Sequence, residues 1–482
     1  MTKKWTLCAL LLLLMFNIPM VSAQQNFYID PINGSDNNTG SENAPWETFR
    51  NVISYYSSNF KPPQWIELQP GDTIFLMEGI HNTLLNPGGD GGATDGGAYL
   101  VYFRGKYGDI NNWFHIKAYP GTNPILDAGG NGSGALIYQS SHWNISDITI
   151  RNAYATGEGG GLRLAEIEHV KVSNVEVYDT DGLDNNNISG LHCAGCYDIE
   201  VFNSSFHDNY DRTNHDTNGE STVNSSNMVF FQGGNISVHD NDFYNSVPTS
   251  AQKSGTCLKY KHASSDPVAY FKVYNNQFEN CKHHAIQTGT ANSHIHHNTI
   301  INSDRIHSID AGGPTHQVNQ TFEYNTIYNS GGILLNPTTN WINQDFPNDP
   351  KNITINNNIF YDLIPAYNQE KGLINIGTYM SDDLYSLILP ELNLHNNCYY
   401  NPNTAIELNI GAQNGGNYGV LGGRYVLSDW QQDLGLDSNS IEADPMFTDI
   451  NNGNFQPETS SPCINMGAFP QYMDLIFEHG FE

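Results

Sequence analysis

Lysines and histidines concentrate in the middle of this chain. Although the chain has only 20 Lys and Arg residues, five lysines lie close together: Lys253, Lys259, Lys261, Lys272 and Lys282. Most of the 18 histidines fall between His192 and His316. Neighbouring cations can neutralise a carboxylate, and a Lys, Arg or His with a lowered pKa can accept a proton. These two roles together support an elimination beside a carboxylate, because the carboxylate must be neutralised while a base removes the adjacent proton.

Short alternating segments place several of these side chains on one face. Four segments alternate apolar and polar residues as half-buried strands do: 161–164, 190–193, 256–261 and 284–287. Their apolar residues are expected to point inward, namely Leu162, Leu191, Leu258 and Ile286. Successive side chains of a strand point to opposite faces, so one outward column is expected to contain Arg163, His192, Lys259 and Gln287.

We define the basic strip as Arg163, His192, Lys259 and Lys261, and these four are the first candidate catalytic residues. Lys259 or Lys261 is expected to be the proton acceptor or the carboxylate clamp. Lys253 and His262 are further candidates because they lie close by in the sequence. The alternative is that these side chains are ordinary solvated polar residues.

A second set of candidates is acidic. Asp179, Asp181 and Asp184 alternate around Gly182 as in an oxygen-ligand loop, which predicts a calcium site. The segment lacks the bidentate Glu and the full length of an EF-hand loop. The alternative is a plain Asp-Gly turn between strands.

Six cysteines follow the amino-terminal segment: Cys193, Cys196, Cys257, Cys281, Cys398 and Cys463. Export from the cell would permit disulfides. Cys257 and Cys281 are about one repeat apart, so we expect a bridge or a buried ladder there. Cys193 and Cys196 could form a redox pair or half a zinc site, but there is no second Cys-x-x-Cys and their context is a Gly-rich turn.

The elements that would position these residues are internal repeats. A short phrase of apolar residues flanked by Asn or Asp recurs, and its central residues are Ile150, Val177, Phe206, Phe243, Phe278, Ile300, Ile327 and Phe360. Each repeat alternates with period two and is divided by Gly and Asn, which indicates strands rather than helices. One such coil cannot bury its own apolar residues, but coils stacked about 4.8 Å apart can. The sequence therefore predicts an all-β chain, a single-stranded right-handed parallel β-helix, with Asn side-chain ladders at its corners.

The ends and the charge of the chain suggest where it acts. Residues 1–23 combine Lys3 and Lys4 with an apolar run and a small-residue cleavage site, which predicts a signal peptide. We expect a β-helix domain at 24–470, a tail at 471–482, and a secreted or periplasmic monomer. The net charge of −30 argues against nucleic acid or an anionic membrane as a partner.

Both ends of the mature chain resemble a broad family of secreted right-handed parallel β-helix proteins, the pectin lyase-like family. The opening carries Tyr28-Ile29-Asp30-Pro31 and Pro45-Trp46-Glu47-Thr48, and the closing segment carries Asp444-Pro445-Met446-Phe447 and Ser461-Pro462-Cys463. The resemblance implies the fold. It does not imply one reaction, because the family includes lyases, hydrolases, epimerases and adhesive proteins.

One segment resembles a narrower group. Lys261-His262, followed by residues 273–278, is similar to the Arg-His-Gly strand and next coil of alginate lyases and chondroitinase B, with Lys in place of Arg and Ala263 in place of Gly. This resemblance implies a lyase-like site and a Ca²⁺ cofactor.

Three function classes follow from these observations. The first expectation is a polysaccharide lyase that cleaves an anionic, uronate-containing polysaccharide by β-elimination. The alternatives are a glycoside hydrolase with paired carboxylates on the same scaffold and a non-catalytic glycan-binding or surface protein. The Asn-Thr-Asp, Gly-Asp-Asp and Gly-His-Gly pattern of polygalacturonases does not occur in the sequence.

Overall fold

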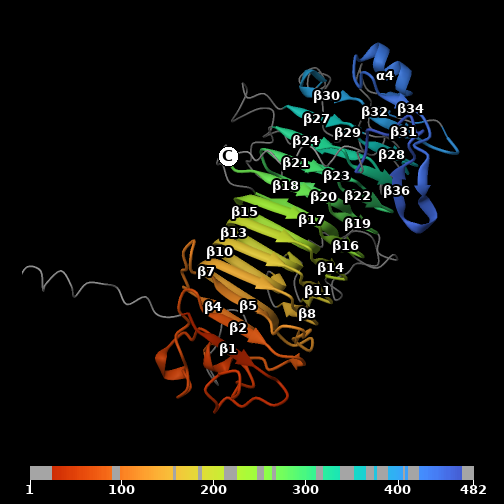
Figure 1. The fold of residues 1–482 in the computed structure, drawn as a ribbon. Coiled ribbons are helices and arrows are strands. Elements are labelled where there is room, and N and C mark those ends of the chain that lie inside the picture. The colour runs from red at the N-terminus through yellow and green to blue at the C-terminus, as the bar shows by residue number, and fades with distance from the viewer. Residues whose placement is uncertain are drawn as a thin grey trace, which may run out of the picture.

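The computed structural model is a stack of β-strand coils with three faces (Figure 1). It describes residues 24–88, 98–155, 159–182, 187–210, 225–246, 255–262, 268–310, 319–336, 352–364, 374–376, 389–404, 406, 408–410 and 423–468. The predicted signal peptide and the predicted tail lie outside these residues and stay predictions. Among the described residues, no helix is long and apolar enough to cross a bilayer.

The first and second faces form one 18-stranded sheet that bends along its length. Four long strands run through both faces: β7 (Ser133–Ser146), β10 (Gly159–Ser173), β13 (Ile188–Phe202) and β15 (Ser226–His239). The first face also holds β4 (Tyr99–Arg104), β17 (Thr256–Lys261), β20 (His284–Thr288), β23 (His307–Asp310), β26 (Ile333–Asn336) and β29 (Ile374–Ile376). The second face also holds β1 (Asn26–Ile29), β2 (Thr73–Leu76), β5 (Phe114–Ala118), β18 (Phe271–Tyr274), β21 (Ser293–His296), β24 (Gln320–Glu323), β27 (Ile353–Asn356) and β30 (Leu392–His395).

The third face is a 12-stranded sheet in which successive coils are neighbours. Its strands are β3 (Ile80–His81), β6 (Ile125–Asp127), β8 (Thr149–Arg151), β11 (Glu176–Tyr178), β14 (Ser205–His207), β16 (Asp242–Tyr244), β19 (Gln277–Glu279), β22 (Thr299–Ile301), β25 (Thr326–Tyr328), β28 (Ile359–Tyr361), β31 (Cys398–Tyr400) and β34 (Ile441–Glu442). All its pairings are parallel, as predicted for a parallel β-helix.

The repeat phrase supplies the inner side of the third face. Its eight central residues pair one with the next in unbroken register, from Ile150 with Val177 to Ile327 with Phe360. All eight are fully buried. The rings of Phe206, Phe243 and Phe278 stack with centroids 5.5 and 4.9 Å apart. The predicted register of the repeats is confirmed.

A ladder of six asparagines occupies the corner between the second and third faces: Asn241, Asn276, Asn298, Asn325, Asn358 and Asn397. In each rung the backbone N–H donates to the side-chain oxygen of the next asparagine at 2.9–3.0 Å. The side-chain amides also donate to backbone carbonyls. The predicted ladder is therefore present.

The ends of the stack and the cysteines complete the scaffold. Trp46 packs on Phe27 at the amino-terminal end, and the short helix α4 (Leu427–Asp433) buries Trp430 at the other end. The smaller pairs are β9 (Tyr154–Ala155) with β12 (Asp181–Gly182), β32 (Leu408–Ile410) with β33 (Gly423–Tyr425), and β35 (Phe447–Asp449) with β36 (Asn454–Pro457). Disulfides join Cys193 to Cys196, Cys257 to Cys281, and Cys398 to Cys463. The bridge between Cys257 and Cys281 is one of the two arrangements expected for this pair.

Candidate functional site

The register of the first face brings the basic strip together. Arg163 pairs with His192 across β10 and β13, and Lys259 pairs with Gln287 across β17 and β20. One further coil lies between these pairs, because Val229 of β15 pairs with both His192 and Lys259. The predicted outward column is confirmed, and Val229 is the member that the sequence analysis missed.

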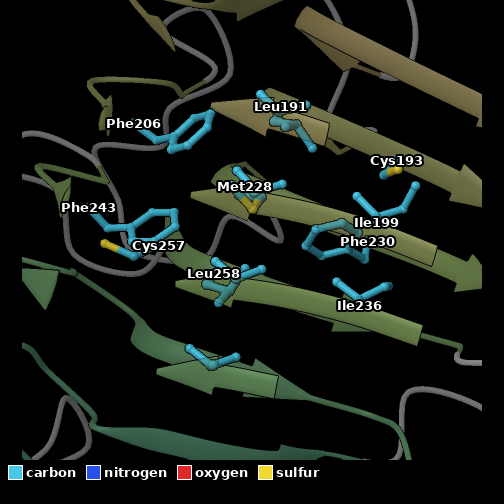
Figure 2. Close-up of a cluster of buried hydrophobic side chains, with 14 of the residues drawn as sticks. Leu191, Cys193, Ile199, Phe206, Met228, Phe230, Ile236, Phe243, Cys257 and Leu258 are labelled. Carbon is cyan, nitrogen blue, oxygen red and sulfur yellow. The ribbon is translucent and has the colours of Figure 1, made fainter. Parts of the chain in front are cut away.

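The strip lies on the outer side of the sheet. Leu162, Leu191, Met228, Leu258 and Ile286 all belong to the main hydrophobic core. Leu191, Met228 and Leu258 are seen side by side in that core (Figure 2). Because strand residues alternate, the residues that follow them point to the opposite side of the sheet.

The outer side of the strip is partly enclosed. His192 has no exposed surface and Lys259 is only 4% exposed, whereas Arg163, Lys261 and Gln287 are partly exposed. A buried lysine or imidazole interacts more strongly with a nearby charge than a solvated one does. The enclosed position therefore gives these side chains the surroundings in which an anion would be bound tightly.

His192 is held neutral within the strip. Its pKa is lowered to about 3, first by burial and then by the positive charges of Arg163 and Lys261. Lys261 donates a hydrogen bond from Nζ to Oδ1 of Asn187 at 3.2 Å. A neutral imidazole offers one donor and one acceptor, so His192 can form hydrogen bonds within the strip without adding charge.

A second group of basic side chains lies beside Lys259. Burial, Arg305 and Lys259 lower the pKa of His283 to about 3, and the pKa of His284 is lowered well below its usual value by burial and by the same neighbours. Nη1 of Arg305 lies 3.5 Å from Nε2 of His284. In the next coil, His307 pairs with the core residue Ile286 and its ring stacks on Phe322 at 5.8 Å, so it lies on the inner side of the sheet and not in this group. Burial lowers the pKa of His307 to about 4.

Arg305 was not among the predicted site residues. It follows His284 by 21 residues, about one coil, and this spacing could have placed the two side chains together. Among the other candidates, His262 lies at the end of β17 and packs against Phe231. Burial and Lys261 lower the pKa of His262. Lys253 lies outside the described residues.

The predicted calcium ligands are only partly described. Asp179 has a left-handed backbone, and Oδ1 of Asp181 accepts a hydrogen bond from the N–H of Gly182 at 2.8 Å. Asp184 lies outside the described residues. Within the described part of the chain, no group of three or more His, Cys, Asp or Glu side chains is arranged to hold a metal ion. Two carboxylates supply the hard oxygen donors that calcium prefers, and the calcium site stays a prediction.

A groove of about 860 Å³ lies on a different flank, at the corner between the second and third faces. Its lining includes Lys117, Tyr119, Glu176 and Asp242 and none of the basic strip. We place the candidate active site at the basic strip because the cations and neutral imidazoles gather there.

No family model and no curated protein sequence matches the chain. Solved structures are similar to it at low identity. A GH136 lacto-N-biosidase from Eubacterium ramulus has a TM-score of 0.44 and 13% identity, over 86% of this chain and 68% of the other. A PL6 family polysaccharide lyase from Pseudopedobacter saltans has a TM-score of 0.43 and 13% identity, over 83% and 95%. The pectate lyase Pel9A has a TM-score of 0.41 and 12% identity, over 93% and 92%.

The reaction has to be inferred from the site, because one scaffold of this kind can host different chemistries. By its own strand register, the chain has a parallel β-helix fold.

Proposed function

We propose that the protein is a polysaccharide lyase that cleaves a uronate-containing polysaccharide by β-elimination at the basic strip. The observation that carries this proposal is the register that aligns Arg163, His192 and Lys259 on one outer column, with Lys261 beside it. On a chain with a net charge of −30, this local group of cations is an exception that favours an anionic ligand.

The cations supply the first requirement of the reaction. Arginine stays charged in proteins and can bind a carboxylate through two parallel hydrogen bonds. Arg163 and Lys261 flank His192, and both act on its pKa through their charge. A uronate carboxylate bound here would be neutralised, which makes the neighbouring C5 proton more acidic.

The second requirement is a base at the C5 proton. We assign this role to Lys259, which is nearly buried, and the carboxylate clamp to Lys261, which is partly exposed. Burial and nearby cations favour the uncharged, basic form of a lysine. The base takes the C5 proton, the electrons of the C5–H bond form the C4–C5 double bond, and the C4–O bond breaks. The departing oxygen then takes up a proton.

A screen of the purified protein on alginate, pectate and chondroitin tests the proposal. The expected result is new ultraviolet absorbance from the unsaturated uronate at the cut end. New reducing ends without that absorbance would instead identify a hydrolase. Binding without either product would identify a glycan-binding protein.

We also propose that calcium supports this activity through Asp179, Asp181 and Asp184. Calorimetric titration of the intact protein with Ca²⁺ is expected to show binding that Asp181→Ala weakens. Absence of binding, or binding unchanged in Asp181→Ala, would contradict the calcium proposal and leave the lyase proposal to the screen above.

A further inference from the structure

The groove at the corner between the second and third faces is built from six consecutive coils near the amino-terminal end. It runs past β5, β8, β11 and β14, which lie together in the orange to yellow part of the ribbon (Figure 1). Its volume, about 860 Å³, is within the range of ligand-binding clefts. None of its lining residues belongs to the basic strip.

One wall of the groove is the turn at residues 119–124, which is fixed by several hydrogen bonds. The N–H of Tyr119 donates to the carbonyl of Leu76 at 2.7 Å, and the N–H of Asn123 donates to Oε2 of Glu78 at 2.8 Å. Thr122 closes the turn through its N–H and its hydroxyl, which both donate to the carbonyl of Tyr119. A wall fixed in this way costs little entropy to order when a ligand binds.

The floor is a row of small polar residues. The corner residues of four successive coils, Asp147, Asn174, Asn203 and Asp240, all have left-handed backbone, which Asp and Asn tolerate better than most residues. Four coils at 4.8 Å per step give a floor about 14 Å long. Beside them, the outer residues of the third face are also in register: Thr149, Glu176, Ser205 and Asp242.

The lining ends at Asp240 and Asp242, and no described residue of a later coil belongs to it. The next corner residue is Asn275, and the two after it are His297 and Tyr324, whose rings stack with centroids 5.2 Å apart. The groove is therefore a local feature of the amino-terminal coils and not a general property of this corner.

Aromatic rings and hydrogen-bonding groups share the lining. The rings of Phe75 and Tyr119 meet edge to face at 6.1 Å, and the Tyr119 hydroxyl donates to Oε1 of Glu42 at 2.5 Å. Aromatic rings provide apolar surface at low entropic cost, while amides, hydroxyls and carboxylates bond to ligand hydroxyl groups. This combination suits a sugar, which has both apolar C–H faces and hydroxyl edges.

The charged side chains that line the groove favour neutral over anionic sugars. Its described lining carries the carboxylates of Asp147, Glu176, Asp240 and Asp242 against one ammonium group, that of Lys117. This ammonium group lies over the Phe75 ring at 5.0 Å. A uronate polymer would be repelled here, in contrast to the basic strip. We propose that this groove binds a neutral oligosaccharide, as a second glycan site independent of the lyase reaction.

Calorimetric titration of the mature chain tests this proposal without any turnover. The probes are four neutral hexasaccharides, gluco-, manno-, xylo- and galacto-configured, with a galacturonate hexamer as the anionic comparison. We expect at least one neutral hexasaccharide to bind. Ser205→Trp, which fills the floor, and Tyr119→Ala, which removes a ring, should each weaken that binding at least tenfold with an unchanged thermal transition.

Two controls locate the site. Glu279→Gln lies on β19, just beyond the lining, and Lys261→Ala lies on the basic strip; both should bind the neutral sugar normally. Failure of all four neutral hexasaccharides would overturn the proposal, as would binding that survives both Ser205→Trp and Tyr119→Ala. Binding of the galacturonate hexamer that is lost in Ser205→Trp would overturn the proposed sugar class. None of these results depends on whether the protein is a lyase.

Discussion

The asparagine ladder and the basic strip are both columns that run along the same β-helix, and they differ in how they use it. The ladder repeats one residue type in six successive coils, and each asparagine bonds to the next. The outer column of the strip changes at every coil, from Arg163 to His192, Val229 and Lys259. A residue type that repeats in every coil has the same structural role each time. A column whose residues differ from coil to coil can instead supply the side chains of a functional site.

Removing one member of the ladder should have the largest effect on stability. Asn298→Ala takes away the acceptor for the N–H of Asn276 and one of the three acceptors of the Asn276 side-chain amide, and it removes the amide that donates to the carbonyl of Val273. Each unsatisfied buried group costs about 1–3 kcal/mol, so we expect a loss of about 3 kcal/mol or more in the free energy of unfolding. Urea denaturation measures this loss. Asn393→Ala, at an exposed position of β30, is the matched control and should change stability by less than about 0.5 kcal/mol. Equal effects of the two variants would contradict the distinction between the columns.

Removing the proposed base should affect activity and not stability. On a substrate found by the screen, Lys259→Ala should lower the rate by at least about 10²-fold, the usual loss for a general base. Rates of product absorbance and a thermal unfolding curve measure the two quantities together. The control is Lys171→Ala, because Lys171 is half-exposed and pairs with Glu200 at 3.1 Å. If both Lys259→Ala and Lys261→Ala keep near-normal turnover, the strip is not the active site.

The pH dependence of stability should distinguish the strip from the ladder, which does not titrate. The folded-state pKa of His192, about 3, lies below the usual histidine pKa of 6.5, so the unfolded chain binds a proton more readily. The stabilisation by neutral His192 is fully present above pH 6.5 and is lost as the pH falls toward 3. By pH 5, this one group should account for about 2 kcal/mol of lost stability.

Comparison of two variants isolates that contribution. Unfolding free energies measured between pH 7 and 5 should fall less steeply for His192→Gln than for the unmodified protein. Gln287→Ala, which changes a non-titrating member of the same column, should keep the original slope. A slope unchanged by His192→Gln would show that His192 is not buried in its neutral form.

Much of the fold could be predicted from the sequence because the same apolar pattern recurs in successive coils. The apolar residues from Ile150 to Phe360 report the same inward position in every coil, and their register was confirmed without a gap. The coil of Val229 was missed because Met228, Val229, Phe230 and Phe231 form a continuous apolar run, without the polar outward residue that marked its neighbours.

The environment of the site could not be predicted in the same way. The burial of His192 and Lys259, and the position of Arg305 beside His284, depend on packing between residues far apart in the sequence. The groove was missed for a related reason. Apart from the coil that holds residues 117–124, each coil contributes at most three residues to it, and Asp147 or Asn174 taken alone is an ordinary turn residue.

The carboxyl-terminal end of the asparagine ladder has a consequence for its hydrogen bonds. The amide of Asn397 donates to Oδ1 of Asp437, which also accepts from the Ser440 hydroxyl, and Oδ2 of Asp437 accepts from Tyr399 at 2.5 Å. When ionised, a carboxylate has no N–H or O–H to donate, so the column of donors stops at this residue. A further asparagine beyond Asp437 would therefore receive no hydrogen bond from a side-chain amide, and the ladder ends at this carboxylate.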